Sequence, residues 1–138
     1  MTSNLLMHGV HVLAIDDDEV VLLAMMQLLK TWGCEVDVAS SIEQALVLAQ
    51  LQTPDILISD YRLRNQRTGT QAITELRDLL GVQVPALIIT GDKAPDRIRQ
   101  ALGNKVPLLH KPLTPSQLKQ AMVDLLGDRS PIFAVHPV

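Results

Sequence analysis

The sequence predicts an α/β domain with a doubly wound, five-stranded parallel sheet and helices on both faces. Five short apolar runs recur at regular spacing along the 138 residues. Three of these runs are nearly continuous in Val, Ile and Leu, which is typical of strands buried on both faces. Stretches with helical periodicity separate the runs. Because crossovers between parallel strands are right-handed, the helices are expected to cover both faces of the sheet.

The predicted strands follow the apolar runs, and the predicted helices follow the spacing of apolar residues and the capping signals between them. The strands are expected at residues 10–15, 35–39, 55–59, 84–89 and 106–110. The first helix, residues 19–32, has apolar residues at helical spacing, and Gly33 follows as a stop. The next helix is expected to begin with the capping-box pair Ser40 and Glu43.

Three further helices are predicted in the second half of the chain. A third helix is expected around residues 72–80, where apolar residues recur at helical spacing. Pro95 occupies the first position of a fourth helix. Thr114, Pro115 and Gln117 supply a cap, an N1 proline and an N3 glutamine for the last one. These elements place one domain at residues 10–127, between tails at 1–9 and 128–138.

Composition excludes several classes of protein. Hydrophobic residues make up 47% of the chain and aromatic residues only 2%, so the core is expected to be aliphatic. The net charge of −3 provides no basic field for nucleic acid. The single cysteine, Cys34, rules out an internal disulfide. No apolar run approaches the roughly 20 residues that span a bilayer, and the N-terminus lacks a secretion signal. We therefore expect a cytoplasmic domain without membrane contact.

Polar side chains follow four of the five predicted strands. Asp16 and Asp17 follow the first, Asp60 the third, Thr90 the fourth and Lys111 the fifth. Ligands of open parallel sheets bind beyond the carboxyl ends of the strands, so these groups are expected to converge. Clustered carboxylates repel one another unless a cation bridges them, and hard oxygen ligands select Mg²⁺ or Mn²⁺. The set therefore contains every part needed to transfer a phosphoryl group to an aspartate.

This arrangement resembles the receiver (response-regulator) domain of two-component signalling, over roughly residues 10–126. Residues 59–64 (SDYRLR), 87–92 (LIITGD) and 108–113 (LLHKPL) are most similar to the C-terminal receivers of hybrid sensor histidine kinases. The resemblance implies a flavodoxin-like fold with strand order 2-1-3-4-5. It also implies a phosphoryl acceptor with slow self-dephosphorylation, not an enzyme in its own right. A hybrid parent chain would be a histidine kinase.

The resemblance also implies a role for each matching residue. Asp60 would accept the phosphoryl group from a phosphohistidine, while Thr90 and Lys111 contact that group. Asp16, Asp17, Asp60 and the backbone carbonyl of Arg62 would hold Mg²⁺, with Mn²⁺ as a substitute. The Lys111–Pro112 peptide would be cis.

Partners follow from the same resemblance. The phosphodonor would be a histidine kinase or its phosphohistidine domain. A histidine phosphotransfer protein and a second copy of the chain are further candidate partners.

Three features depart from the family's pattern. Leu108 occupies the position, three before the lysine, where members usually carry an aromatic residue. The segment 60–69 is one residue longer than the common form, and Arg64 replaces its usual proline. We expect a mobile, basic loop over the acidic pocket. An ion pair between Arg62 and Asp92 is a further hypothesis, because it would shield the phosphoryl group from water.

Two alternatives compete with a phosphoacceptor. Residues 16–20 (DDDEV) fit the first motif of haloacid-dehalogenase-type phosphatases, in which Asp16 would be the nucleophile. The chain is short for the core and cap of that family. The second alternative is a degenerate receiver that serves only as a protein-binding scaffold. Phosphorylation of Asp60 separates the first interpretation from both alternatives.

Overall fold

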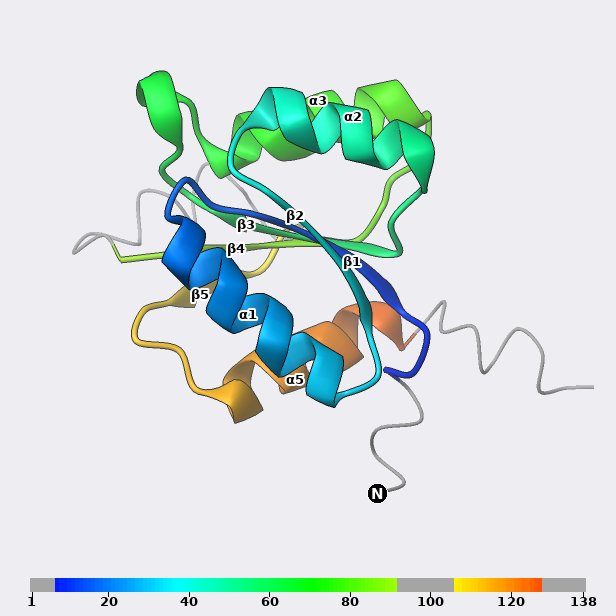
Figure 1. Cartoon of the computed structure of the whole chain (residues 1–138), viewed down its shortest axis with the longest axis vertical. Coiled ribbons are helices and arrows are strands. Elements are labelled where there is room, and N and C mark those ends of the chain that lie inside the picture. The colour runs from blue at the N-terminus through cyan, green and yellow to red at the C-terminus, as the bar shows by residue number, and fades with distance from the viewer. Residues whose placement is uncertain (1–6, 92–105, 128–138) are drawn as a thin grey trace, which may run out of the picture.

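A computed structural model describes residues 7–91 and 106–127, and these residues contain one parallel five-stranded sheet (Figure 1). The strand order is β2-β1-β3-β4-β5, and every neighbouring pair is parallel. The strands are β1 (His11–Ile15), β2 (Glu35–Ala39), β3 (Ile56–Asp60), β4 (Ala86–Thr90) and β5 (Leu108–His110). The predicted fold class and strand order are therefore confirmed.

Helices cover both faces of this sheet. In Figure 1, α2 (Ile42–Leu51) and α3 (Gly69–Leu80) lie on one face, and α1 (Glu19–Thr31) and α5 (Pro115–Leu126) lie on the other. The helix expected to begin at Pro95 lies outside the described residues. Within the described residues, no helix is long and apolar enough to cross a membrane.

The strands are buried on both faces because each face has its own aliphatic core. Along β1, Leu13 and Ile15 belong to the core with α2 and α3, whereas Val12 belongs to the core with α1 and α5. Each of these three side chains is at most 1% exposed. The nearly continuous apolar run at the start of the sequence reflects this double burial.

β2 has the predicted bounds, the other four strands differ from the predictions by one or two residues at an end, and prolines explain two of these shifts. β4 begins after Pro85 and β5 after Pro107, because a proline lacks the N–H group with which a residue facing the neighbouring strand donates to it. Both proline carbonyls still accept hydrogen bonds from the neighbouring strand. At the other end, Asp60 is the last residue of β3 rather than the first residue after it.

The helix caps confirm two predictions and correct one. Gly33, with φ of 88°, follows the end of α1, and Thr114 with Gln117 forms the capping box of α5. The capping-box prediction for Ser40 and Glu43 is wrong by one residue. Ser41 is the N-cap of α2, and its Oγ accepts the N–H of Gln44 at 3.1 Å.

The reason for this shift is the side chain of Gln44. Its Oε1 accepts the backbone N–H of Ser40 at 2.8 Å, so Gln44 performs the role expected of Glu43. The carboxylate of Glu43 instead forms an ion pair with Arg67, which lies in the loop between β3 and α3.

Residues 7–9, assigned by the sequence to the N-terminal tail, contact the domain. Met7 is fully buried in the core under α1 and α5. The N–H of Gly9 donates to the carbonyl of Gly33 at 2.8 Å, which ties this segment to the end of α1.

Candidate functional site

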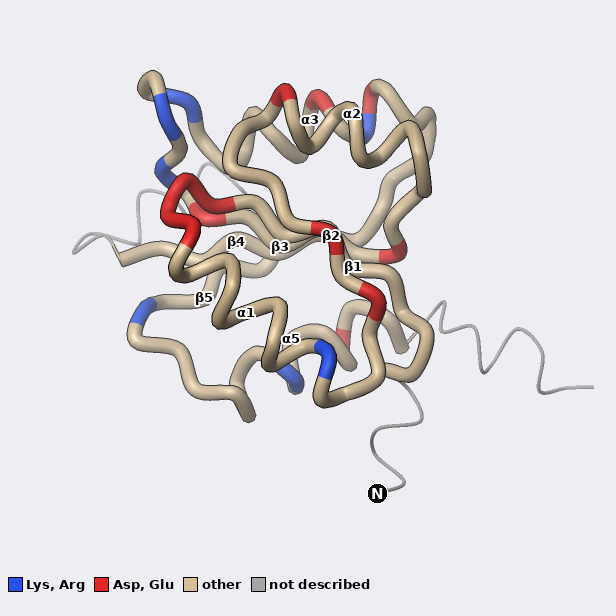
Figure 2. Tube along the Cα trace, in the orientation of Figure 1, with Lys and Arg blue, Asp and Glu red and all other residues tan. Residues whose placement is uncertain are grey.

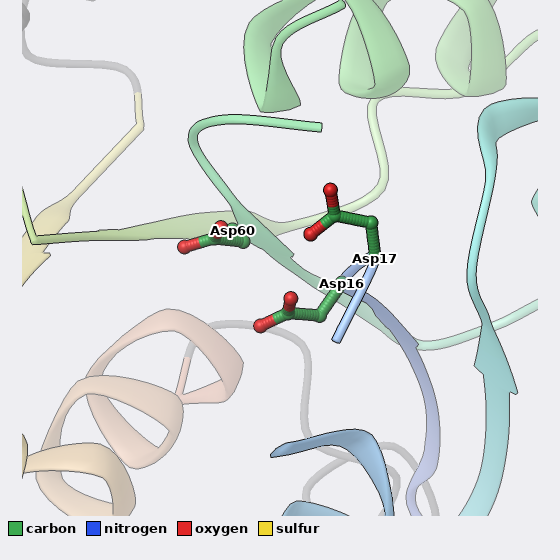
Figure 3. A group of neighbouring side chains, drawn as sticks. All are labelled: Asp16, Asp17 and Asp60. Carbon is green, nitrogen blue, oxygen red and sulfur yellow. The ribbon is translucent and has the colours of Figure 1, made fainter. Parts of the chain in front are cut away.

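Three aspartates meet at the carboxyl edge of the sheet. Asp16 and Asp17 follow β1, and Asp60 ends the adjacent strand β3. One carboxylate oxygen from each lies within 4.8 Å of the others, and Figure 3 shows the three side chains grouped where the two strands end. The structure thus brings together the three carboxylates that the sequence predicted to converge.

Lys111 and Thr90 lie at the same edge. The Nζ atom of Lys111 is 3.1 Å from Oδ1 of Asp60, so Lys111 is a cationic partner of the cluster. The backbone N–H of Lys111 donates to the carbonyl of Thr90 at 2.8 Å, which fixes the start of the β5–α5 loop against β4. Thr90 ends β4 and is buried. The Lys111–Pro112 peptide is cis, as predicted.

Crowding and burial make this cluster electrostatically unfavourable. Burial is the main cause that raises the pKa of Asp16 to about 6, and the negative charges of Asp60 and Asp17 add to the shift. Burial also raises the pKa of Asp60, although its hydrogen bond and ion pair with Lys111 oppose the shift. A divalent cation among the three carboxylates would remove the repulsion and favour their ionised forms.

The donor set fits such a cation. Three carboxylate oxygens close together are the hard ligands that Mg²⁺ and Mn²⁺ prefer. Carboxylates that are buried, as Asp16 is, or partly buried, as Asp60 is, and that have raised pKa values are also more common at functional sites than elsewhere. Beside the cluster, an aliphatic cavity of about 280 Å³ opens between α1 and α5, with Asp16, Asp60 and Lys111 in its wall.

The start of α3 packs tightly against the end of β3, where Asp60 lies. A Cβ atom at Gly69 would lie 2.5 Å from the carbonyl oxygen of Asp60 and 2.8 Å from Oγ of Ser59. The Oγ atom of Ser59 donates to the same Asp60 carbonyl at 2.9 Å, and the N–H of Gly69 donates to the backbone carbonyl of Tyr61 at 2.7 Å. Sequence reasoning missed both Ser59 and Gly69 as site residues. Gly69 precedes the helix predicted around residues 72–80, and no pattern in the sequence marked it; only the observed α3 begins at this glycine.

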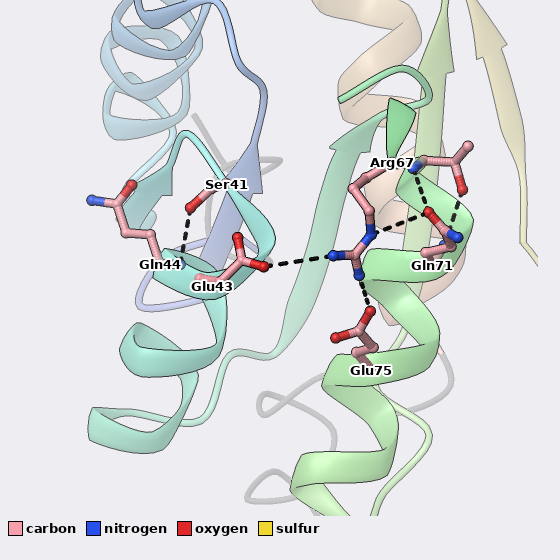
Figure 4. Close-up of polar contacts among 7 residues, drawn as sticks. Ser41, Glu43, Gln44, Arg67, Gln71 and Glu75 are labelled. Carbon is pink, nitrogen blue, oxygen red and sulfur yellow. Dashed lines mark hydrogen bonds and ion pairs between the residues drawn. The ribbon is translucent and has the colours of Figure 1, made fainter. Parts of the chain in front are cut away.

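The loop between β3 and α3 is basic, as predicted, and has several anchors. Leu63 is buried in the core, and residues 62 and 68 form an isolated bridge at the base of the loop. Arg67 pairs with Glu75 of α3 and with Glu43 of α2, as Figure 4 shows. The mobility of the loop stays a prediction.

The tip of this loop lies beside the acidic loop after β1. Figure 2 shows the blue arginine positions next to the red acidic positions at that edge of the sheet. Arg64 donates to the backbone carbonyl of Asp17 at 3.2 Å, a contact that sequence reasoning missed. The guanidinium carbon of Arg62 lies 5.7 Å from the centre of the Tyr61 ring. The hypothesised partner of Arg62, Asp92, lies outside the described residues.

Leu108 occupies a buried position. Its side chain is 8% exposed and belongs to the core that also contains Val106 and residues of α2 and α3. An aliphatic side chain therefore fills the position where an aromatic one is usual.

A parallel sheet of order 2-1-3-4-5, with an acidic cluster and a lysine at its carboxyl edge, defines the flavodoxin-like receiver class. The chain belongs to the response regulator receiver domain family, whose model matches residues 12–123. Domains of this family are phosphoryl acceptors in two-component signalling. They bind Mg²⁺ at an aspartate cluster and interact with histidine kinases or phosphotransfer proteins.

Individual relatives support the same family. Alginate biosynthesis transcriptional regulatory protein AlgB of Pseudomonas aeruginosa is 32% identical over 122 residues, which are 86% of this chain and 26% of AlgB. Two-component response regulator ARR17 of Arabidopsis thaliana is 26% identical over 134 residues, with 87% of each chain covered. The structure of chemotaxis protein CheY4 of Vibrio cholerae superposes with a TM-score of 0.75 at 27% identity, covering 86% of this chain and 99% of that one. The chain thus spans about a quarter of AlgB and most of ARR17 and CheY4.

Proposed function

We propose that this chain accepts a phosphoryl group on Asp60 from a phosphohistidine, with Mg²⁺ held by Asp16, Asp17, Asp60 and the backbone carbonyl of Arg62. One observation carries the proposal: three carboxylates within 4.8 Å of one another, with Lys111 3.1 Å from Asp60. Repulsion among the three carboxylates destabilises the folded protein. A bound cation would remove this repulsion and would also stabilise the charge on a transferred phosphoryl group.

In the proposed reaction, a carboxylate oxygen of Asp60 attacks phosphorus in line with the leaving nitrogen. The new O–P bond forms as the N–P bond breaks, and the imidazole nitrogen keeps the electron pair and takes a proton. Lys111 contributes a positive charge to the transferred oxygens, and the Thr90 hydroxyl contributes a hydrogen bond. Mg²⁺ or Mn²⁺, when bound, supplies further charge neutralisation. Later attack by water restores Asp60, which makes the domain a phosphoryl acceptor with slow self-dephosphorylation.

The proposed phosphodonor is a histidine kinase or its phosphohistidine domain, and a histidine phosphotransfer protein is the proposed relay partner. The cavity beside Asp60 supports a helical donor, because its aliphatic wall could receive an apolar side chain that neighbours the phosphohistidine. A second copy of the chain is a further candidate partner. Neither nucleic acid nor membrane is a proposed partner, and the proposed location is the cytoplasm.

The parent protein is a separate proposal. The motifs at residues 59–64, 87–92 and 108–113 support a receiver within a hybrid histidine kinase. The relatives add two further kinds of parent protein, since AlgB is named a transcriptional regulatory protein and ARR17 a two-component response regulator.

The test is the intact mass of the protein after incubation with acetyl phosphate and Mg²⁺. We expect a single phosphoryl adduct in the wild type, no adduct in Asp60→Asn and slow formation in Asp16→Asn. Asp55→Asn is the matched control, because that carboxylate lies at the opposite edge of the sheet beside β3. Chelation of Mg²⁺ should stop adduct formation without removing an adduct already formed.

Two results would contradict the proposal. An adduct that survives in Asp60→Asn and disappears in Asp16→Asn would identify Asp16 as the nucleophile, as in the phosphatase alternative. If neither acetyl phosphate nor a phosphorylated histidine kinase yields an adduct, the scaffold alternative holds.

A further inference from the structure

Arg64 joins the two loops that carry the acidic cluster. Its Nη2 donates to the backbone carbonyl of Asp17 at 3.2 Å, across 47 positions of sequence. Asp17 belongs to the loop after β1, and Arg64 belongs to the loop after β3, two residues beyond Arg62. Among the side-chain hydrogen bonds of the described residues, this contact links the two loops directly. The contact therefore restrains the backbone of Asp17, whose carboxylate lies beside that of Asp60.

The backbone of the loop between β3 and α3 has an unusual conformation directly after Arg64. Asn65 and Gln66, with φ of 59° and 61°, are both in the left-handed region that non-glycine residues rarely adopt. Two such residues in succession persist only when surrounding contacts determine the conformation. Here, those contacts are the burial of Leu63 and the pairing of Arg67 with Glu43 and Glu75. The strained tip and its anchors therefore hold Arg64 over the β1–α1 loop.

The contact is to the backbone of Asp17 and not to a carboxylate. A guanidinium bound to a carboxylate would occupy an oxygen that a cation needs. By donating to the carbonyl, Arg64 leaves the Asp17 carboxylate available to the group in Figure 3. The hydrogen bond therefore restrains the loop without occupying a carboxylate oxygen of the cluster.

We propose that Arg64 is a positioning residue that clamps the β1–α1 loop and so pre-organises Asp17 for the divalent cation. The inference rests on the proposed function, because it assigns a residue to the same cation site. Pre-organisation lowers the ordering cost of binding, so the clamp strengthens binding of Mg²⁺. A positive charge near the site has the opposite effect, because it repels the cation. The sign of the change on removing Arg64 therefore decides between the two roles.

The experiment compares Arg64→Ala, Arg64→Lys and the control Gln66→Ala, an exposed neighbour on the same loop tip. Calorimetry with Mg²⁺ alone measures the dissociation constant of each protein. We expect Arg64→Ala to weaken Mg²⁺ binding about threefold to tenfold, the size of one lost hydrogen bond. Arg64→Lys retains a donor on a long side chain and should recover part of the loss. Gln66→Ala should bind as the wild type does. Thermal unfolding verifies that each variant is folded.

Amide hydrogen exchange in metal-free protein provides a second readout. The N–H of Asp18 donates to Oδ1 of Asp16 at 2.9 Å, so its exchange reports opening of the β1–α1 loop. We expect about threefold to tenfold faster exchange at Asp18 in Arg64→Ala, with unchanged exchange in the core strands. Unchanged exchange in Arg64→Ala overturns the clamp, whether or not the protein binds Mg²⁺.

The calorimetric outcomes separate this inference from the proposed function. Tighter Mg²⁺ binding by Arg64→Ala, or binding equal to that of the wild type, overturns the clamp while the proposed function stands. If the wild type itself binds no Mg²⁺, the proposed function fails, and the exchange measurement alone decides whether Arg64 holds the loop.

Discussion

The two edges of the sheet contain similar residues in opposite electrostatic arrangements. His11 is the first residue of β1, at the amino edge, and its Nε2 lies 2.8 Å from Oδ2 of Asp37, which is in the middle of β2. Asp55 accepts the backbone N–H of His11 at 2.8 Å, so each carboxylate there has its own contact with His11. At the carboxyl edge, by contrast, Asp16, Asp17 and Asp60 crowd together within 4.8 Å.

This difference indicates which edge stabilises the fold and which edge is shaped for binding. Carboxylates with individual partners contribute to stability, because their desolvation is offset by hydrogen bonds. The carboxyl edge instead contains two aspartates with raised pKa values, Asp16 and Asp60, and burial is the main cause in both. A chain keeps such an arrangement at a functional site and compensates for it elsewhere. The following variants test this contrast, beginning with the largest expected effect.

The largest effect is expected at Gly69, which supports the carboxyl edge from below. Gly69→Ala places a Cβ atom 2.5 Å from the Asp60 carbonyl, so β3 and α3 must move apart. We expect a loss of about 2–3 kcal/mol in the free energy of unfolding, measured by urea denaturation. Gly91→Ala is the matched control, because its Cβ would meet Lys111 at an ordinary 3.7 Å. Equal losses in the two variants would contradict this explanation.

Removing the Asp16 charge should stabilise the metal-free protein. Folding raises the pKa of Asp16 from 3.8 to about 6, so the folded state holds its proton more tightly than the unfolded state does. Below about pH 4 both states are protonated and the group has no effect. Between about pH 4 and pH 6 the free energy of unfolding falls as pH rises, and above pH 6 the penalty is constant.

Asp16→Asn should therefore gain about 1–3 kcal/mol at pH 7 over the wild type, and little or nothing at pH 3.5. The amide oxygen of the new asparagine can still accept the N–H of Asp18. Urea unfolding at both pH values measures the difference. A variant that is less stable than the wild type at pH 7 would show that the cluster is not repulsive.

At the amino edge, removal of a carboxylate should have the opposite sign. Asp37→Ala deprives the His11 ring, which is 4% exposed, of its contact at Nε2. We expect a loss of about 1–2 kcal/mol in the free energy of unfolding at pH 7. The comparison with Asp16→Asn, measured under the same conditions, is decisive. If both variants shift stability in the same direction, the contrast between the edges is refuted.

The smallest change in stability is expected for Lys111. Its side chain is 40% exposed, so Lys111→Met should alter the free energy of unfolding by about 0.5–1 kcal/mol at most. The variant should instead raise the pKa of Asp60 further, because the hydrogen bond and ion pair with Lys111 lower it. Carboxyl-carbon NMR titration measures this pKa. An unchanged pKa would mean that the contact does not persist in solution.

Sequence patterns were sufficient for the features that depend on regular structure. The apolar runs located the strands, and the residues at their ends located Asp16, Asp60 and Lys111. The receiver resemblance supplied the strand order. These inferences succeed because the carboxyl ends of parallel strands must share one edge.

Features that depend on the backbone conformation of loops could not be predicted from sequence patterns. The contact from Arg64 to Asp17 accompanies positive φ at Asn65 and Gln66. Asparagine is a residue type that tolerates positive φ, but the glutamine that follows it gives no such signal. The α2 cap was misplaced because Ser40 and Ser41 are adjacent, and only the Gln44 side chain distinguishes them. The approach of Gly69 to Asp60 likewise depends on how α3 meets β3.

The central claim is that the acidic cluster is unfavourable by itself and is relieved by a divalent cation. The most direct measurement is the free energy of unfolding at pH 7, with and without Mg²⁺, for the wild type, Asp60→Asn and His11→Gln. At a Mg²⁺ concentration about ten times the dissociation constant, the wild type and His11→Gln should each gain about 1.4 kcal/mol. Asp60→Asn should be more stable than the wild type without Mg²⁺ and gain much less from it. Equal gains in wild type and Asp60→Asn, or no gain in the wild type, would contradict the claim.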